Sequence, residues 1–347
     1  MTGVAVVGCG TISDQYLQTL SGASDVAVVF CADLDVPRAA AVAEKYSVPK
    51  HGTVAEALAS PDVSLVVNLT IPAAHVEVTT AAIAAGKHVW SEKPLAMTPD
   101  AAAELVQLAA DAGLRLGCAP DTVLGPGLQN AYTLAGSGLI GTPMTALALM
   151  QGPGPDQWHP DPEFLFSTGA GPLFDMGPYY LTALSLLFGP VTSVAATGLQ
   201  ARATRVIGAG PRAGTEFPVE VPTYVSALLS YAGGAAATIV LSFDSPASHQ
   251  PLIEVAGTEA TMALPDPNRF DGDVRVKRTG DKDWTVYPAE AGDGKRGLGV
   301  LDMVRSIRSG VPHRCSGELA LHVVDTMTAI AESAQTGSFV PVRTTFS

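Results

Sequence analysis

VAVVGCGTIS, at residues 4–13, joins an apolar strand to the start of a helix through a glycine turn. Gly8 permits the tight turn, and Gly10 lets the main chain come close to a ligand. The N–H groups of Thr11 and Ile12 then open the helix, and a helix N-terminus attracts phosphate. This strand–turn–helix pattern predicts a site for the pyrophosphate of a dinucleotide.

Strand-like and helix-like segments alternate through the first third of the chain. Each strand-like segment is a short, nearly continuous apolar run, which is typical of a strand buried on both faces. The pattern predicts an α/β fold with an N-terminal Rossmann domain, a doubly wound parallel sheet, over residues 1–120. The expected strands are 4–7, Val26–Ala32, Leu65–Leu69, His88–Trp90 and Leu114–Cys118, and the expected helices are Ile12–Leu20, 99–112 and His75–Ala85.

The pattern changes after Pro120, and residues 121–347 are predicted to form a second, α+β domain. Strand-like runs separated by turn signals dominate residues 191–288. We expect a mainly antiparallel open sheet with helices on one side. The expected hairpins turn at 232–234 and 280–281, and the expected helices cover Leu298–Ile307 and Gly317–Ala334.

The composition of the 347-residue chain restricts its partners. Its formal net charge of −13 repels the phosphates of nucleic acids and of anionic lipids. No apolar run reaches the roughly 20 residues that a membrane span needs. The chain opens on a strand, without the basic segment of a signal peptide, so we expect a cytoplasmic protein. No metal site is predicted, because Cys9, Cys31, Cys118 and Cys315 lack metal-ligand spacing and read as buried thiols.

Asp33 lies at the end of the second predicted strand, about 20 residues beyond the glycine turn. A carboxylate there accepts hydrogen bonds from the ribose hydroxyls of NAD and repels the 2′-phosphate of NADP. No basic residue follows directly, so NAD is the expected cofactor. Arg38 is the nearest cation and leaves NADP possible.

Residues 68–75, at the end of a core strand, resemble the loop that passes beside the nicotinamide ribose in some Rossmann enzymes. Thr70, Pro72 and His75 are therefore candidate cofactor contacts. A single histidine at a helix start is unremarkable, so His75 could equally be a surface residue.

The tripeptide Glu92-Lys93-Pro94 follows the strand at 88–90 and is the most specific signal in the chain. It places a lysine at the carboxyl edge of the sheet, where open α/β sheets bind ligands. Lys93 is the candidate for proton transfer there, and Glu92 and Pro94 are expected to line the cofactor site. Asp121, just past the next strand, is a further candidate for cofactor contact.

Three motifs in order resemble a known family. GCG at 8–10, EKP at 92–94 and DMGPY at 175–179 follow one another as in the glucose–fructose oxidoreductase, inositol dehydrogenase and MocA family (Gfo/Idh/MocA). Residues 317–322 are similar to that family's closing helix. The resemblance implies a second domain that binds substrate and often forms an oligomer interface.

The resemblance also implies roles for three residues. Lys93 matches the family lysine that contacts the reacting hydroxyl and the nicotinamide, and Asp175 matches the aspartate of an Asp-x-Gly-x-His motif. Tyr179 stands where many inositol dehydrogenase-like members have histidine, although members similar to glucose–fructose oxidoreductase have tyrosine. We expect Tyr179 to be the proton-transfer group; the alternative is an ordinary buried helix residue.

Residues 151–172 are rich in glycine and proline, and a loop of that length in a compact protein is usually functional. Trp158 is expected to stack on a sugar ring, and His159 to reach the substrate as a competing base. Alternatively, Trp158 anchors the loop in the core. Arg202, Arg205 and Arg212 lie in a later glycine- and proline-broken insertion and are expected to be solvated, rather than to grip an acidic substrate.

The combined interpretation is an NAD(P)-dependent oxidoreductase that acts on CH–OH groups. Hydride would pass between nicotinamide and a carbon of a sugar, cyclitol or related polyol, as the family resemblance implies. Two alternatives are a glycosidase that uses NAD for transient oxidation and elimination, and a redox-silent dinucleotide sensor, against which Lys93 and Asp175 argue. The resemblance also implies a homodimer or homotetramer through the C-terminal sheet.

Overall fold

The computed structural model describes residues 1–248, 253–290, 292 and 294–346 and divides into two compact units. The first unit is Met1–Gly125 with Asp293–Val324, and the second is Pro126–Gly292 with Asp325–Ser347. The sequence placed the boundary at Pro120 and assigned everything after it to the second domain. The structure instead returns a C-terminal segment to the first unit. No helix among the described residues is long and apolar enough to cross a bilayer.

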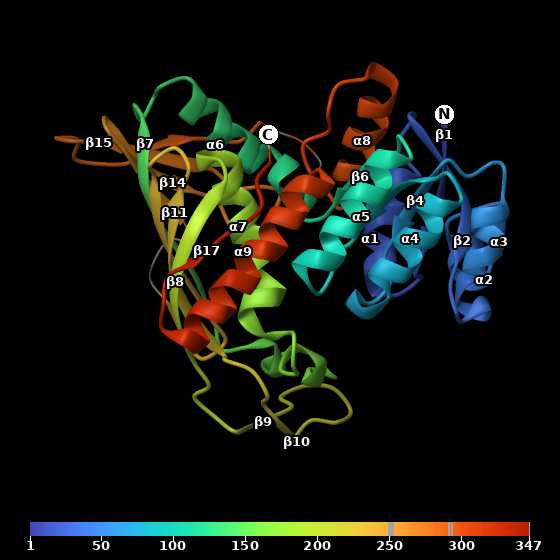
Figure 1. Cartoon of the computed structure of the whole chain (residues 1–347), viewed down its shortest axis with the longest axis horizontal. Helices are drawn as coiled ribbons and strands as arrows, with labels where there is room; N and C mark the ends of the chain where they lie inside the picture. Colours follow the sequence, from blue (N-terminus) through green and yellow to red (C-terminus); the bar gives the residue numbers. More distant parts are fainter. Residues whose placement is uncertain (249–252, 291, 293, 347) are drawn as a thin grey trace. The chain divides into compact units, whose positions relative to one another are not determined.

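The first unit contains a six-stranded parallel sheet in the order β3-β2-β1-β4-β5-β6, which confirms the Rossmann prediction (Figure 1). The order runs one way from β1 to β3 and the other way from β1 to β6. Right-handed crossovers therefore put α1 and α2 on one face and α3, α4 and α5 on the other. The strands are β1 (Thr2–Val7), β2 (Val26–Ala32), β3 (Lys50–Gly52), β4 (Leu65–Asn68), β5 (His88–Ser91) and β6 (Leu116–Cys118).

The helices of this unit include two that the sequence interpretation left unassigned, α2 and α3. Their bounds are α1 (Thr11–Leu20), α2 (Val36–Lys45), α3 (Val54–Ala59), α4 (His75–Ala84), α5 (Pro99–Asp111) and α8 (Leu298–Ser309), with short 3₁₀ turns η1 (Pro72–Ala74) and η2 (Asp121–Leu124).

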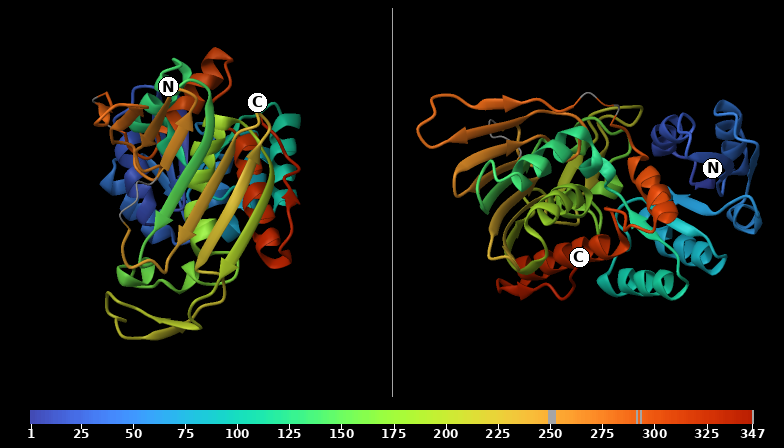
Figure 2. Two further views of the ribbon diagram at one scale, coloured as in Figure 1. Left: turned by 90° about the vertical axis from the view of Figure 1, so that its left-hand side faces the viewer. Right: turned by 90° about the horizontal axis from the view of Figure 1, so that it is seen from above.

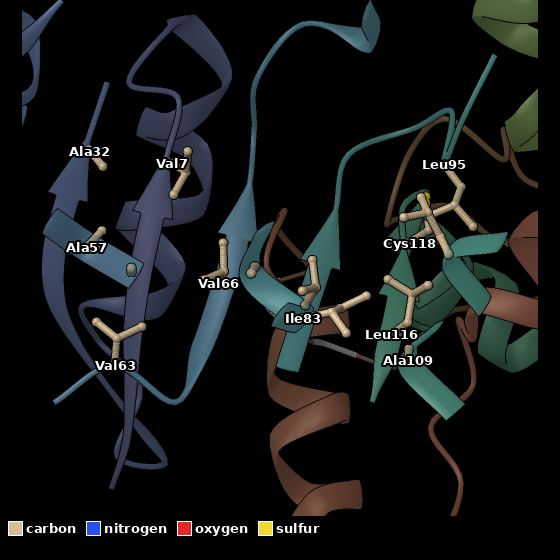
Figure 3. Packing of buried hydrophobic residues seen from close by; sticks show 14 of the residues in the cluster. Val7, Ala32, Ala57, Val63, Val66, Ile83, Leu95, Ala109, Leu116 and Cys118 are labelled. Atoms are coloured by element: carbon tan, nitrogen blue, oxygen red, sulfur yellow. The ribbon is translucent and has the colours of Figure 1, made fainter. Parts of the chain in front are cut away.

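One core of this unit lies between the sheet and helices α3, α4 and α5. Figure 3 shows the strand residues Val7, Val66 and Leu116 in one cluster with Ala57, Ile83 and Ala109 of the helices. Because all the strands are parallel, their carboxyl ends form one edge of the sheet. The glycine turn, Asp33 and the EKP tripeptide all lie at strand ends on that edge.

The second unit contains a nine-stranded sheet in the order β16-β15-β14-β13-β7-β12-β11-β8-β17. All pairs are antiparallel except β7 with β12, so the predicted, mainly antiparallel sheet is confirmed. Figure 2 shows α7 on one face of this sheet, while no helix among the described residues covers the other, open face. The strands are β7 (Pro143–Gln151), β8 (Val191–Leu199), β11 (Tyr224–Tyr231), β12 (Ala236–Ser242), β13 (Ile253–Gly257), β14 (Ala260–Leu264), β15 (Val274–Arg278), β16 (Thr285–Tyr287) and β17 (Val340–Pro341).

The remaining elements shape the surroundings of this sheet. A separate hairpin of β9 (Thr204–Val206) and β10 (Glu216–Pro218) projects from it, and the predicted loop at 151–172 contains η3 (Pro155–Gln157) and η4 (Glu163–Leu165). The helices are α6 (Pro126–Gly136), α7 (Gly171–Phe188) and α9 (Gly317–Thr336), the last of which contributes to both units.

Candidate active site

The turn between β1 and α1 has the shape that a pyrophosphate site needs. Gly8 has φ +92°, and a Cβ there would lie 2.7 Å from the main chain of Leu69, so only glycine fits. Gly10 caps α1 without a side-chain hydrogen bond, and a Cβ built on it meets no described atom within 4 Å. The first N–H groups of α1 therefore open toward a space next to Gly10. A dinucleotide pyrophosphate fits this arrangement.

Asp33 is held by four hydrogen bonds at the end of β2. It accepts from the N–H of Cys9 at 2.7 Å and of Asp35 at 2.9 Å, and from Nε and Nη2 of Arg38 at 3.1 and 2.6 Å. Burial raises the pKa of Asp33, but the hydrogen bonds from Arg38 and the two N–H groups outweigh it and hold the pKa below its ordinary value. Asp33 is thus a carboxylate paired with a half-exposed guanidinium. The sequence identified Arg38 as the nearest cation, and the structure pairs it directly with Asp33.

The loop after β4 is organised by buried polar groups. The amide of Asn68 donates to the carbonyl of His75 and to Thr79, and its oxygen accepts from Thr70 Oγ1 at 2.7 Å. His75 is fully buried, with one ring nitrogen 2.6 Å from the carbonyl of Pro94 and the other 3.0 Å from that of Thr70. The surface alternative for His75 is therefore wrong. Its ring ties the loop after β4 to the loop after β5, while Pro72 is exposed in η1.

The carboxylate of Glu92 is held by Tyr16 of α1 and by the main chain of Lys93. Its Oε1 accepts from Tyr16 Oη at 2.8 Å, and Trp90 Nε1 donates to the same tyrosine oxygen at 3.2 Å. Its Oε2 accepts from the N–H of Lys93 at 3.1 Å. Lys93 is partly buried, and the peptide between it and Pro94 is cis. The network sets the main-chain position from which the Lys93 side chain starts.

Asp121 has a different environment from the one predicted. It is fully buried, and its Oδ2 accepts from the N–H groups of Gly297 at 2.7 Å and Gly299 at 3.2 Å, at the start of α8. Its Oδ1 lies 3.6 Å from Arg296. Burial raises the pKa of Asp121 to about 6, against the opposing charge of Arg296. Its observed contacts anchor the returning C-terminal segment, which sequence spacing could not reveal because those partners are 176 and 178 residues away.

In the second unit, Asp175 and Tyr179 lie one turn apart on α7 and share a helix face. Asp175 is partly buried and Tyr179 is 6% exposed. Gly171 and Pro172 begin the helix, directly after the glycine-rich loop. The motif is therefore placed at the junction between that loop and the helix.

Trp158 is 67% exposed, so the alternative that it anchors the loop in the core is wrong. The anchor is Phe166, which is fully buried among Ile207, Phe217 and Phe243. Trp158 instead packs edge-on against His159, which lies partly buried beside it.

The prediction that all three arginines of the insertion are solvated is wrong for Arg205. Its side chain is 2% exposed and forms ion pairs with Asp156, at 2.6 Å, and with Asp244. Arg212 is half-exposed and pairs with Asp161 and Glu163. Arg202 is exposed and forms no ion pair with another described residue.

Sequence reasoning also missed apolar side chains near the carboxyl edge of the first sheet. Leu34, next to Asp33, is 97% exposed, and Ile71, between Thr70 and Pro72, is 70% exposed. A large aliphatic residue two or three positions after a core strand, with polar or proline neighbours, is the sequence signal that could have marked them. Tyr16 gave no signal, because its partner Glu92 lies far along the chain.

Comparison with known proteins places both parts of the chain in one family. Residues 2–119 match the GFO/IDH/MocA oxidoreductase family, NAD-binding Rossmann fold, and residues 128–263 match the GFO/IDH/MocA C-terminal domain. These matches confirm the resemblance carried by the three motifs.

Individual relatives cover nearly the whole chain. A D-xylose 1-dehydrogenase (NADP⁺) from Haloferax volcanii is 28% identical, over 92% of this chain and 93% of its own length. An inositol 2-dehydrogenase from Saccharopolyspora erythraea is 27% identical, over 98% of this chain and 95% of its own length. The crystal structure of an NAD-binding oxidoreductase from Klebsiella pneumoniae superposes with a TM-score of 0.85 and 25% identity, covering 99% of each chain.

Proposed function

The chain belongs to the GFO/IDH/MocA family of NAD(P)-dependent oxidoreductases, and on that premise we propose that its substrate is a sugar, a cyclitol or a related polyol. The reaction would move a hydride between a hydroxyl-bearing carbon and nicotinamide. The observation that carries this proposal is the fixed EKP tripeptide. Tyr16 holds Glu92, Glu92 holds the N–H of Lys93, and all three lie at the carboxyl edge where a dinucleotide fits.

The cofactor site would use main chain for the pyrophosphate and side chains for the rest. The N–H groups that follow Gly8 would bind the phosphates, and Asp33 would accept from the ribose hydroxyls. Thr70, Pro72 and Glu92 would border the nicotinamide half. When bound, the dinucleotide supplies the carbon that accepts or gives the hydride.

We propose that NAD is preferred and that NADP is tolerated. Asp33 is a carboxylate with a lowered pKa, which repels a 2′-phosphate. Arg38 covers that carboxylate and has a half-exposed side chain, so it could turn toward a phosphate.

Proton transfer at the substrate oxygen is assigned to Lys93 with Tyr179, and Asp175 would orient one of them. An alcohol oxidation must remove the hydroxyl proton as the hydride leaves carbon. Tyrosine is a weak base at neutral pH, but an ammonium brought to the same substrate oxygen would favour its phenolate. His159 is the competing base.

The substrate class is inferred from relatives and from the exposed loop. The relatives include enzymes named for D-xylose and for inositol, and both ligands present ring hydroxyls next to apolar C–H faces. Trp158 offers an exposed indole that could stack on such a face.

The experiment is a screen for absorbance at 340 nm with NAD and with NADP. The panel contains D-xylose, D-glucose, myo-inositol and aryl glycosides of these sugars. We expect reduction of NAD by at least one free polyol, with a higher kcat/KM than NADP gives. Release of sugar from a glycoside without net NADH would favour the glycosidase alternative, and dinucleotide binding with neither reaction would favour a sensor.

We also propose that two copies pair through the open face of the nine-stranded sheet. Leu147 of β7, Thr238 of β12 and Leu228 of β11 are register neighbours on adjacent strands, and the two leucines are 41% and 53% exposed. Exposed leucines in one row on a sheet favour burial against a partner. Leu228→Lys should shift the mass measured by light scattering toward the monomer, whereas Val311→Lys, at an exposed site in the first unit, should not.

A further inference from the structure

Three aromatic rings stand together on the surface of the second unit. Trp158 is 67% exposed and Phe164 is 58% exposed, and His159 lies between them. The ring centroids are 5.5 Å apart for Trp158 and His159 and 5.4 Å apart for His159 and Phe164, both with edge-to-face geometry. We call these three residues the aromatic platform. Large exposed rings that are held together, instead of buried, point to a ligand.

The buried side chain of Arg205 holds the start of the loop that carries the platform. This guanidinium donates to the carbonyl of Pro153 at 2.8 Å and to that of Phe243 at 2.6 Å, besides its ion pairs with Asp156 and Asp244. It also lies over the Phe166 ring, 5.1 Å from the centroid. A planar, five-donor guanidinium can satisfy this many acceptors at fixed angles, which a lysine cannot.

The tip of the β9–β10 hairpin holds the outer part of the same loop. Gly208 donates to the carbonyl of Asp156 at 2.8 Å, and a Cβ built on Gly210 would lie 2.7 Å from Pro160. Arg212 pairs with Asp161 at 2.9 Å and with Glu163, two carboxylates that lie between His159 and Phe164 in the chain. The insertion at 200–220 therefore packs along the loop, from its buried start to its exposed aromatic end.

The platform is connected to the second-unit part of the proposed active site. The turn η4, which contains Phe164, contacts α7, and the chain enters α7 after Ala170. Asp175 lies in the second turn of that helix. Any shift of the loop would therefore move the platform relative to the residues assigned to proton transfer.

We propose that the insertion at 200–220 is a clamp that positions the aromatic platform as a subsite for the ring of a hexose, pentose or cyclitol. The inference rests on the polyol substrate proposed above and adds Arg212 and Arg205 as positioning residues for substrate choice. Trp158 and Phe164 meet the apolar C–H face of the ring, while Asp161 and Glu163 stay engaged by Arg212. A platform fixed in advance binds more tightly, because the loop loses no freedom on binding.

Arg212→Ala tests the clamp without removing a buried charge, since Arg212 is half-exposed, whereas an Arg205 variant would leave buried carboxylates unpaired. Arg202→Ala, in the same insertion, is the matched control.

In titrations with D-xylose and myo-inositol, Trp158 fluorescence gives Kd, and Trp158→Phe identifies the signal. We expect Arg212→Ala to raise Kd, and KM for whichever polyol is turned over, by about tenfold with kcat within about twofold, as lost preorganisation predicts. Arg202→Ala should match the wild type.

Unchanged Kd and KM in Arg212→Ala would overturn the clamp, as would a fall in kcat at constant KM. Absence of a Trp158 response to either polyol would overturn the subsite. The fluorescence titration needs no hydride transfer, so it separates the two proposals. A Trp158 response with an Arg212 effect but no NADH production would support the clamp and contradict the proposed reaction. NADH production with no Arg212 effect would support the proposed reaction and contradict the clamp.

Discussion

The two glycines of the β1–α1 turn have different physical reasons to be glycine. Gly8 has positive φ and no space for a Cβ, so its replacement would strain the fold. Gly10 has φ −80° and free space beside it, so alanine is compatible with the folded chain. The space next to Gly10 is where a pyrophosphate would lie.

Gly10→Ala should therefore impair binding without loss of stability. We expect Kd for NAD to rise by at least about tenfold, which is about 1.4 kcal/mol of binding energy. The free energy of unfolding should stay the same or rise by up to about 1 kcal/mol, as for glycine to alanine at a compatible backbone. Gly22→Ala, where the new Cβ would have only ordinary contacts, is the control. Equal NAD affinity in the wild type and Gly10→Ala would remove the pyrophosphate from this turn.

The Lys93→Met substitution should slow the chemical step and leave dinucleotide binding nearly unchanged. A general acid–base group contributes roughly 10²–10⁴-fold to the rate. We expect kcat to drop within that range while Kd for NADH, measured by fluorescence, changes less than about threefold. Lys50→Met, which removes an exposed lysine paired with Asp62, should leave both quantities unchanged. More than a tenth of the wild-type kcat in Lys93→Met would contradict the role.

Tyr179 and His159 can be separated by their pH profiles. If Tyr179 takes the proton, Tyr179→Phe loses most of kcat, by roughly 10²-fold or more, together with the rise of kcat toward alkaline pH. His159→Asn should then mainly raise KM. The opposite pattern would assign the base to His159 and leave Tyr179, at 6% exposure, as a packing residue of α7.

At the scale of elements, α8 depends on a carboxylate from η2. Asp121 accepts from the first N–H groups of α8, and its folded-state pKa is about 6, against an ordinary value of 3.8. The folded protein therefore keeps a proton that the unfolded chain releases between about pH 4 and 6. Stability falls as pH rises through this window, by about 3 kcal/mol for this group alone, and the loss is complete above it.

Asp121→Asn should remove that part of the pH dependence. We expect the difference in unfolding free energy between Asp121→Asn and the wild type to grow in favour of the variant from pH 4 to 6. Urea unfolding, followed by the fluorescence of buried Trp90, measures it. Asp111→Asn, at an exposed position on α5, should run parallel to the wild type. Parallel curves for Asp121→Asn as well would mean that Asp121 titrates normally.

Elements with strong apolar runs were predictable, whereas α2 and β7, in which the buried residues are alanines, were not. The strands β1, β2 and β4 lie where their valine-rich runs indicated. In contrast, α2 buries only Ala39 and Ala43, which leave no apolar stripe to detect. Strand β7 buries Ala146 and Ala148 and exposes Leu147, which reverses the usual alternation. Side-chain size in these segments follows the neighbouring element, which local sequence does not specify.

At the scale of the molecule, several contacts that sequence reasoning did not anticipate join residues far apart in the chain. Asp121 meets the start of α8, Arg205 meets Asp156 and Asp244, and Cys118 donates from its N–H to the carbonyl of Cys315. The contacts of Asp121 and Cys118 return a C-terminal segment to the first unit, whereas those of Arg205 lie within the second. Motif spacing identifies the family and the edge of the sheet, but side-chain partners across such separations follow from the folded chain alone.

The most direct test of hydride transfer uses a substrate deuterated on every carbon. The polyol that is most active at 340 nm is supplied in this form, and the reduced dinucleotide is analysed by mass spectrometry. Direct transfer predicts one deuterium in each reduced dinucleotide, whichever carbon reacts, and a lower kcat/KM than with the protiated polyol if hydride transfer limits the rate. Reduced dinucleotide without deuterium, or no reduction by any polyol, would contradict the proposed function.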